Sequence, residues 1–257
     1  SNDIRGNGDE GGMVIAATDG WWYRVYAYGR NRPVELSWYE FSSGDDSTVV
    51  FEQLFAAYPA GVAVRMPDFA GHIVVNTISV QIPEFTLLGG VTELWQHAAP
   101  TDDYYVFRLD NVSYLNVDAA LVCRGRYGAF GVAPGNQAFP GGFFAINEAA
   151  GNLSYALFYP RIYDTTGLGL KLGGNIGQVT IGSWMQNSGA LCGVGGDTLH
   201  YDNAYFSDPD GNGLKDYTQN LYEKWHGMRT VGYINVTGKI TLQYGGEHWF
   251  LSNTINI

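Results

Sequence analysis

One short helical pattern followed only by strand patterns constrains this fold more than any other feature of the chain. Apolar residues recur at helical spacing at Val50, Leu54 and Ala57, which predicts an amphipathic helix over residues 47–58. From Val62 onward the pattern changes to alternation with a period of two. A single helix ahead of many short strands predicts a β-solenoid whose open hydrophobic end is covered by that helix.

Short strand patterns separated by Gly, Asn, Asp and Pro fill the rest of the chain. The first expected strands are 62–66, 73–75, 78–82 and 85–88, and similar runs continue to the C-terminus. The 35 glycines and the low share of charged residues, 15%, fit an all-β chain with many tight turns. Repeats of roughly 20–30 residues would stack as parallel coils. A β-sandwich is the alternative, although it would show more even hairpin signals.

The N-terminal region resembles a known family. Gly11-Gly12, a short strand at 14–17, the turn Asp19-Gly20, a strand at 34–38 and the run at 45–48, DDST, follow one another. This order is similar to the start of phage tailspike proteins of the pectin-lyase-like family, and residues 167–193 also resemble tailspike coils. The resemblance implies a single-stranded right-handed parallel β-helix (pectin-lyase-like) with a short N-terminal capping helix.

The resemblance also implies a function. Such proteins are homotrimeric receptor-binding proteins on the bacteriophage virion surface, attached to other virion proteins, and they bind a bacterial surface polysaccharide. Many are depolymerases that act as glycoside hydrolases or polysaccharide lyases, and whether this chain is an enzyme stays open. Two alternatives remain: a free extracellular polysaccharide hydrolase or lyase of the same fold, and a non-enzymatic structural or decoration protein of a virus particle.

We expect two regions along the chain. Residues 1–43 form an N-terminal neck segment, and residues 44–257 form the β-helix domain. Polar or Gly-rich stretches interrupt the strand pattern, and the longest is a loop excursion near 198–228. Loops on a rigid scaffold are where binding residues concentrate.

The excursion contains the sharpest local motif, DPDGNGLKD. Its oxygen-bearing side chains are Asp208, Asp210, Asn212 and Asp216. Hard oxygens at this spacing suit a structural Ca²⁺, although Gln219 stands where an EF-hand loop has its bidentate Glu. The motif could instead be a polar turn that caps the helical pattern after it. No cofactor is required by either interpretation.

Paired carboxylates are the chemistry that glycoside hydrolysis needs. The two groups lie about 5–5.5 Å apart in retaining enzymes and about 6.5–9.5 Å apart in inverting ones. Parallel strands lie about 4.8 Å apart, so carboxylates on adjacent or next-adjacent coils satisfy these distances. Asp164 and Asp197, which open expected strands beside aromatic residues, lead the catalytic candidates, followed by Glu148. The alternative for each is a turn residue that hydrogen-bonds its own backbone.

A lyase and a binding protein would use other residues. A lyase would take a Lys or Arg as its base, and spacing does not select among Arg124, Arg126, Arg161 and Lys171. Carbohydrate binding would use flat aromatic faces beside turns, for which the candidates are Trp95, Trp184, Trp225 and Trp249. Burial in the core is the alternative for each aromatic residue.

Composition excludes several partners and sites. The formal net charge of −11 argues against a nucleic-acid partner, because phosphate binding needs clusters of Lys and Arg. No apolar run approaches the roughly 20 residues of a membrane helix, so no membrane insertion is expected. Cys123 and Cys192 lie in apolar strand patterns and are interpreted as buried free thiols, with a disulfide as the alternative.

Overall fold

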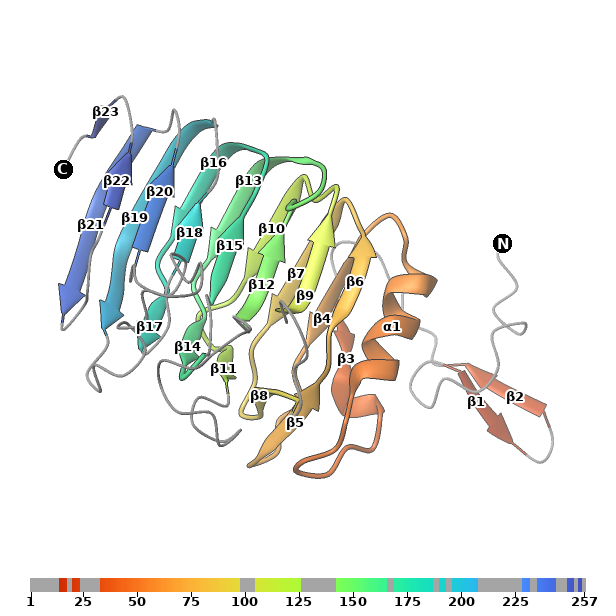
Figure 1. Cartoon of the computed structure of the whole chain (residues 1–257). Helices are drawn as coiled ribbons and strands as arrows, with labels where there is room; N and C mark the ends of the chain where they lie inside the picture. Colours follow the sequence, from red (N-terminus) through yellow and green to blue (C-terminus); the bar gives the residue numbers. More distant parts are fainter. Residues whose placement is uncertain are drawn as a thin grey trace, which may run out of the picture.

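The chain forms a stack of parallel strands (Figure 1). The computed structural model describes residues 14–17, 20–23, 33–97, 105–125, 142–165, 169–186, 190–192, 196–207, 228–231, 235–243, 249–251 and 254–255, in some strands by backbone alone. Within them, the strands from residue 34 onward pair in parallel, and β1 (Val14–Ala17) and β2 (Gly20–Tyr23) form an antiparallel pair. The prediction of a mostly β fold is confirmed.

The parallel strands form three ladders. Ladder 1 contains β3 (Val34–Glu35), β4 (Val62–Arg65), β7 (Glu84–Leu88), β10 (Tyr114–Val117), β13 (Asn152–Phe158), β16 (Asn175–Ile181), β19 (Gly196–Ser207), β21 (Asn235–Gln243) and β23 (Thr254–Ile255). Ladder 2 contains β5 (His72–Val75), β8 (Glu93–Gln96), β11 (Val122–Arg124), β14 (Arg161–Tyr163) and β17 (Trp184–Gln186), and it continues into the C-terminal parts of the long strands β19 and β21. Ladder 3 contains β6 (Ile78–Gln81), β9 (Tyr105–Asp110), β12 (Gly142–Ile146), β15 (Leu170–Leu172), β18 (Ala190–Cys192), β20 (Met228–Val231) and β22 (Trp249–Leu251).

The order of strands along the chain shows how the ladders arise. From β4 to β18, consecutive strands visit ladders 1, 2 and 3 in turn, and each set of three lies on the set before it. This arrangement is compatible with a parallel β-helix, in which each coil adds one strand to each ladder. Backbone hydrogen bonds from β3 to β4 attach residues 34–35 of the expected neck segment to the first coil.

Large apolar side chains stacked from coil to coil form the core. Ring centroids lie 5.4 Å apart for Phe85 and Phe107, 5.4 Å for Phe107 and Phe144, and 5.3 Å for Phe144 and Phe158. These rings are at most 1% exposed, and burying such a side chain stabilises the fold by about 1.5–3 kcal/mol. Cys123 lies in this core as a free thiol, as expected.

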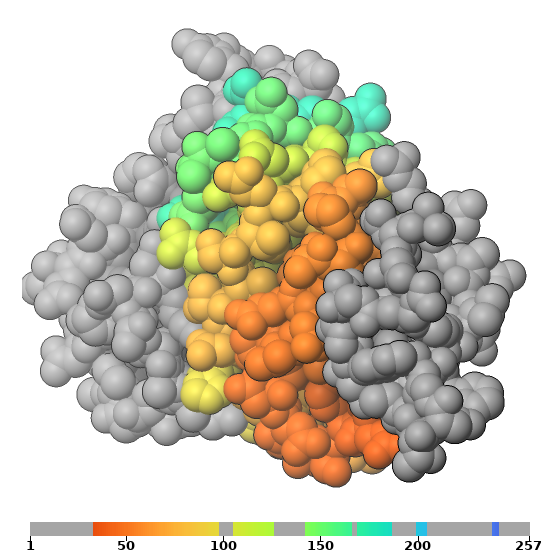
Figure 2. All heavy atoms as spheres, turned by 90° about the vertical axis from the view of Figure 1, so that its right-hand side faces the viewer, coloured from red at the N-terminus to blue at the C-terminus, as the bar shows by residue number. Residues whose placement is uncertain are grey.

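Helix α1 (Thr48–Ala57) covers one end of the stack, where the sequence predicts a capping helix (Figure 2). Leu54 of the expected apolar face is buried together with Phe51 and Phe55, whereas Val50 and Ala57 are both half-buried. The physical reason is that two phenylalanines bury more apolar area than Val and Ala. The rings of Phe51 and Phe55 each lie 5.3 Å from a core phenylalanine ring. No helix among the described residues has the length and apolar character needed to cross a bilayer.

Strand β19 begins where the loop excursion was expected to begin. Residues 198–207 lie in β19, paired with β16 and then with β17, so they are strand rather than loop. The register shifts between Tyr201 and Ala204, and Asn203 adopts a positive φ of 53°. The polar residues that suggested a loop therefore mark a β-bulge that redirects the strand. Residues 208–227, the rest of the expected excursion, lie outside the described residues.

Candidate functional site

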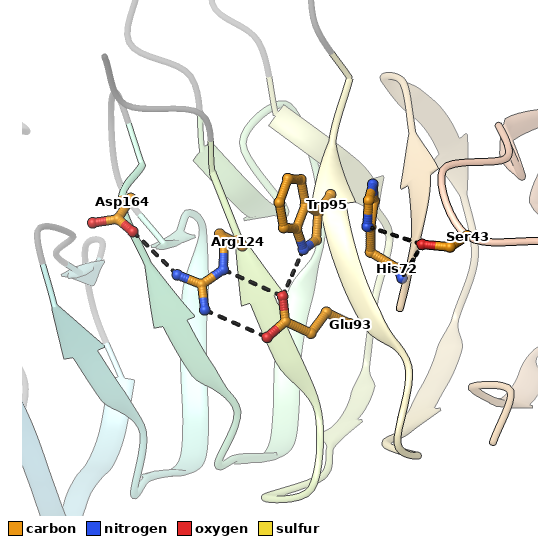
Figure 3. Close-up of polar contacts among 6 residues, drawn as sticks. All are labelled: Ser43, His72, Glu93, Trp95, Arg124 and Asp164. Carbon is orange, nitrogen blue, oxygen red and sulfur yellow. Dashed lines mark hydrogen bonds and ion pairs between the residues drawn. The ribbon is translucent and has the colours of Figure 1, made fainter. Parts of the chain in front are cut away.

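The outer face of ladder 2 brings aromatic and charged side chains together (Figure 3). Leu94, Cys123 and Ile162 lie opposite one another and are buried in the core. Because side chains alternate along a strand, their neighbours Trp95 and Arg124 lie on the other face, directly opposite each other. His72 and Glu93 are opposite each other on the same face. We call the group His72, Glu93, Trp95, Arg124, Tyr163 and Asp164 the ladder 2 cluster.

Arg124 is the centre of the cluster and contacts two carboxylates. Its Nε donates to Glu93 Oε2 at 3.2 Å and its Nη2 to Glu93 Oε1 at 3.4 Å, a two-pronged contact. Its Nη1 donates to Asp164 Oδ2 at 3.3 Å. The hydrogen bond to Glu93 raises the pKa of Arg124, against the opposing effect of burial, so the guanidinium stays charged.

Glu93 is held in its ionised form. Partial burial alone would raise its pKa, but hydrogen bonds from Arg124 and Trp95 and the charge of Arg124 outweigh burial and leave the pKa below its ordinary value. Trp95 Nε1 donates to Glu93 Oε2 at 2.6 Å. A carboxylate of lowered pKa can act as a hydrogen-bond acceptor or a base, but it is a poor proton donor near neutral pH.

Flat groups stack along the same face. The rings of His72 and Trp95 are stacked, with centroids 4.0 Å apart and planes 20° from parallel. The guanidinium carbon of Arg124 lies 5.1 Å from the centre of the Tyr163 ring. Ser43 fixes the far end, because its Oγ accepts from the His72 backbone N–H at 3.3 Å and lies 3.4 Å from His72 Nδ1. These contacts hold the aromatic rings in place before any ligand arrives.

Asp164 occupies an unusual backbone position. It follows β14 with a φ of 54°, a conformation that Asp and Asn adopt more readily than most residues. Its backbone N–H donates to the Gln186 carbonyl at 3.0 Å. Gly125 packs against it so closely that a Cβ there would lie 2.3 Å from the Asp164 carbonyl oxygen. The contact of its carboxylate with Arg124, rather than this conformation, keeps Asp164 a candidate. Asp164 ends a strand, however, and does not open one as the sequence suggested.

The two catalytic candidates whose side chains are described, Glu148 and Asp164, lie on different ladders. Glu148 follows β12 of ladder 3, where Lys171 Nζ lies 2.7 Å from its Oε1 and Arg108 Nη2 lies 3.3 Å from its Oε2. Asp197 lies in β19, and only its backbone is described. Among the three, only Asp164 therefore has a described contact within the ladder 2 cluster.

The aromatic and metal candidates fall in several places. Trp95 belongs to the cluster, and Trp184 lies on β17 of the same ladder with 42% of its surface exposed. Trp249 lies in β22, where the backbone alone is described, and Trp225 lies outside the described residues. The calcium candidates Asp208, Asp210, Asn212 and Asp216 also lie outside them. Within the described part of the chain, no group of three or more His, Cys, Asp or Glu could hold a metal ion.

Sequence reasoning missed Glu93, His72 and Tyr163, and it named Arg124 only as one of several possible bases. One signal was available for Glu93, because Glu93 and Trp95 are two residues apart in a strand and so share a face. The contact between Glu93 and Arg124 had no local signal, since 31 positions separate these residues.

Comparisons of the chain with protein-family models, with curated proteins and with solved structures find no match. The tailspike resemblance is thereby neither supported nor contradicted.

Proposed function

We propose that the chain is a tailspike-like receptor-binding protein that binds a bacterial surface polysaccharide along the outer face of ladder 2. In this proposal the fold is a right-handed pectin-lyase-like β-helix, and the protein is a homotrimeric appendage of a bacteriophage virion. The observation that carries the proposal is the pre-arranged ladder 2 cluster, where stacked rings adjoin two carboxylates that share one guanidinium.

The cluster has the chemistry of a saccharide site. Trp95 offers an apolar ring with a polar edge, and Glu93 and Asp164 offer acceptors for sugar hydroxyl groups. The chain's net charge of −11 disfavours polyphosphate ligands, and the positive charge of Arg124 is already compensated by two carboxylates. An extended ladder also offers an extended polymer several successive contacts.

Hydrolysis is the second function that we propose, because the same two carboxylates could serve it. Glu93 and Asp164 lie on next-adjacent coils and are offset by three positions along the strands, and their side chains converge on Arg124 from the two sides. Inverting glycosidases hold their two carboxyl groups roughly 6.5–9.5 Å apart, and two carboxylates on opposite sides of one guanidinium can meet that distance. Glu93 would take a proton from a water molecule that attacks the anomeric carbon, and Asp164 would serve as the general acid that gives a proton to the leaving oxygen. Arg124 is unsuited as a lyase base because its pKa is raised.

Binding to a panel of bacterial capsular and O-chain polysaccharides tests the proposal. Affinity electrophoresis should show retention of the wild type by at least one polymer. Arg124→Gln should weaken that retention about tenfold or more, a loss of about 1.4 kcal/mol. Arg65→Gln is the matched control, because Arg65 forms a single ion pair with Glu35 on ladder 1, at 3.2 Å. Failure of every polymer to retain the wild type would refute a receptor-binding role, and equal retention of the two variants would place the site elsewhere.

Chain length of the retained polymer tests hydrolysis separately. Size-exclusion profiles before and after incubation should show shortening by the wild type and none by Glu93→Gln or Asp164→Asn. Glu35→Gln should shorten the polymer normally. If a polymer is retained but keeps its length, the chain binds polysaccharide without hydrolysing it. Sedimentation as a monomer would favour a free extracellular protein over a trimeric appendage.

A further inference from the structure

The outer face of ladder 1 differs in chemistry from the ladder 2 cluster. Tyr114 and Tyr155 lie directly opposite each other on β10 and β13, and their rings stack with centroids 5.7 Å apart and planes 14° from parallel. Tyr155 is 39% exposed, one of few large hydrophobic side chains in the described residues with such exposure. Gln178 lies opposite Tyr155 on β16. The exposed ring thus has an amide beside it on the next coil.

This face carries no charge over three successive coils. The strands β10, β13 and β16 contain no Asp, Glu, Lys or Arg at any position. Their second outer row runs from Asn116 through Leu157 to Thr180, again with uncharged groups only. By contrast, the ladder 2 strands β11 and β14 of the same coils include Arg124 and Arg161.

A third tyrosine extends the aromatic groups to the edge of the face. Tyr159 follows β13, and its hydroxyl donates to Asp202 Oδ2 on β19 at 3.3 Å. Its ring lies over Gly182, where a Cβ would be 2.4 Å from two ring carbons, so only glycine leaves room. Burial and the nearby Asp202 raise the pKa of Tyr159, so its hydroxyl stays a donor. We call Tyr114, Asn116, Tyr155, Tyr159 and Gln178 the tyrosine face.

We propose that the tyrosine face is a second saccharide contact that binds an uncharged stretch of polysaccharide. This inference rests on the proposed function, and it adds a site and a ligand class to it. Phenol rings supply rigid amphipathic contact area, and the amides of Asn116 and Gln178 both donate and accept hydrogen bonds, as sugar hydroxyl groups do.

Charge selects among the possible ligands. An anionic polymer needs cations to compensate its carboxylates or phosphates, and β10, β13 and β16 offer none. A peptide added as an extra strand has no free backbone edge here, because β13 pairs with β10 on one side and β16 on the other. A neutral glycan is the polymer that these groups match.

Affinity electrophoresis in gels that contain a single polysaccharide tests this inference. The probes are dextran, mannan and a neutral O-chain polysaccharide, with polygalacturonate and alginate as anionic polymers. The wild type should be retained by at least one neutral probe, and Tyr155→Ala and Gln178→Ala should each reduce that retention several-fold. Tyr155→Phe, which keeps the ring, should retain most of the binding. Val49→Ala is the surface control, because Val49 on α1 is 61% exposed and far along the chain from this face.

Each outcome separates this inference from the proposed function. Retention that Arg124→Gln weakens and Tyr155→Ala leaves unchanged would keep the proposed function and overturn the tyrosine face. Retention by anionic probes alone would overturn it as well. If the wild type sediments as an oligomer that Tyr155→Arg dissociates, the face is an interface between copies of the chain, and the inference is wrong. If none of these probes and no polymer of the bacterial panel retains the wild type, both the proposed function and the tyrosine face are wrong.

Discussion

Two corners of the coils, at Asn147 and Asp164, have the same backbone conformation but side chains with different roles. Asn147 follows β12 with a φ of 57°, and Asp164 follows β14 with a φ of 54°. Asn147 is buried, and its amide both donates to the Val112 carbonyl and accepts from the Val112 N–H, each at 2.8 Å. Asp164 is half-buried, and its carboxylate contacts Arg124. A positive φ alone therefore does not mark a functional residue, and the destination of the side chain distinguishes the two corners.

The largest loss of stability is expected at the buried Asn147 corner. Asn147→Ala removes both hydrogen bonds, leaves the buried Val112 backbone groups unpaired, and places a Cβ-bearing residue without a polar tip at positive φ. The free energy of unfolding should fall by about 3 kcal/mol. Urea unfolding monitored by circular dichroism measures this loss.

Two further variants at Asn147 separate the causes. Asn147→Gly accepts the positive φ and should recover about 1 kcal/mol of the loss. Asn147→Asp keeps the shape but replaces the amide donor with a buried carboxyl group, so it should remain strongly destabilised. A loss below about 1 kcal/mol for Asn147→Ala would show that the contact to Val112 contributes little.

A smaller loss of stability is expected when a substitution at the neighbouring Gly125 displaces the Asp164 corner. A Cβ at Gly125 would lie 2.3 Å from the Asp164 carbonyl oxygen and 2.7 Å from the Thr165 Cα, both backbone atoms. Gly125→Ala must therefore move the corner, with a cost of about 1–3 kcal/mol. Because the movement displaces the Asp164 carboxylate from Arg124, polysaccharide retention should weaken as well. If this variant has normal stability and normal polysaccharide retention, the Asp164 corner can move without a cost in free energy.

The sequence predicts much of the fold because local patterns decide it. Alternation identifies the buried residues Val62, Val64 and Met66, and helical spacing identifies the region of α1. The register between coils is different, since it depends on the length of each loop. Phe85 pairs with Leu115, Leu115 with Ala156, and Ala156 with Val179, at unequal separations in the sequence.

The candidate site could not be predicted because it depends on that register. Arg124 meets Glu93 and Asp164 only if three coils align as they do, and no local pattern contains this information. The sequence named Asp164 as a candidate because a carboxylate beside a strand and an aromatic residue is a local pattern. Glu148 was also named because it lies near a strand end, yet it contacts Lys171 and Arg108 on ladder 3.

Acid should affect the ladder 2 cluster and leave the Asn147 corner unchanged. The folded pKa of Glu93 lies below its ordinary value, so its contribution to stability is present above the unfolded pKa and is lost as pH falls through the folded pKa. Between neutral pH and pH about 3.5, the wild type should lose slightly more stability than Glu93→Gln. Urea midpoints of both proteins at the two pH values test this, and an equal loss would contradict the lowered pKa of Glu93.

The smallest effect on stability is expected from Asp164→Asn. Asn adopts the same positive φ as Asp, so the corner keeps its conformation. The change removes one ion pair whose two side chains are each about one third exposed, 34% for Arg124 and 33% for Asp164, so the loss should be about 0.2–1 kcal/mol. Any hydrolysis should nevertheless disappear, because Asn cannot give a proton to the leaving oxygen. Unfolding curves and polymer chain lengths measure the two effects on one variant. A large loss of stability together with normal cleavage would contradict the comparison, because Asp164 would then stabilise the fold as Asn147 does.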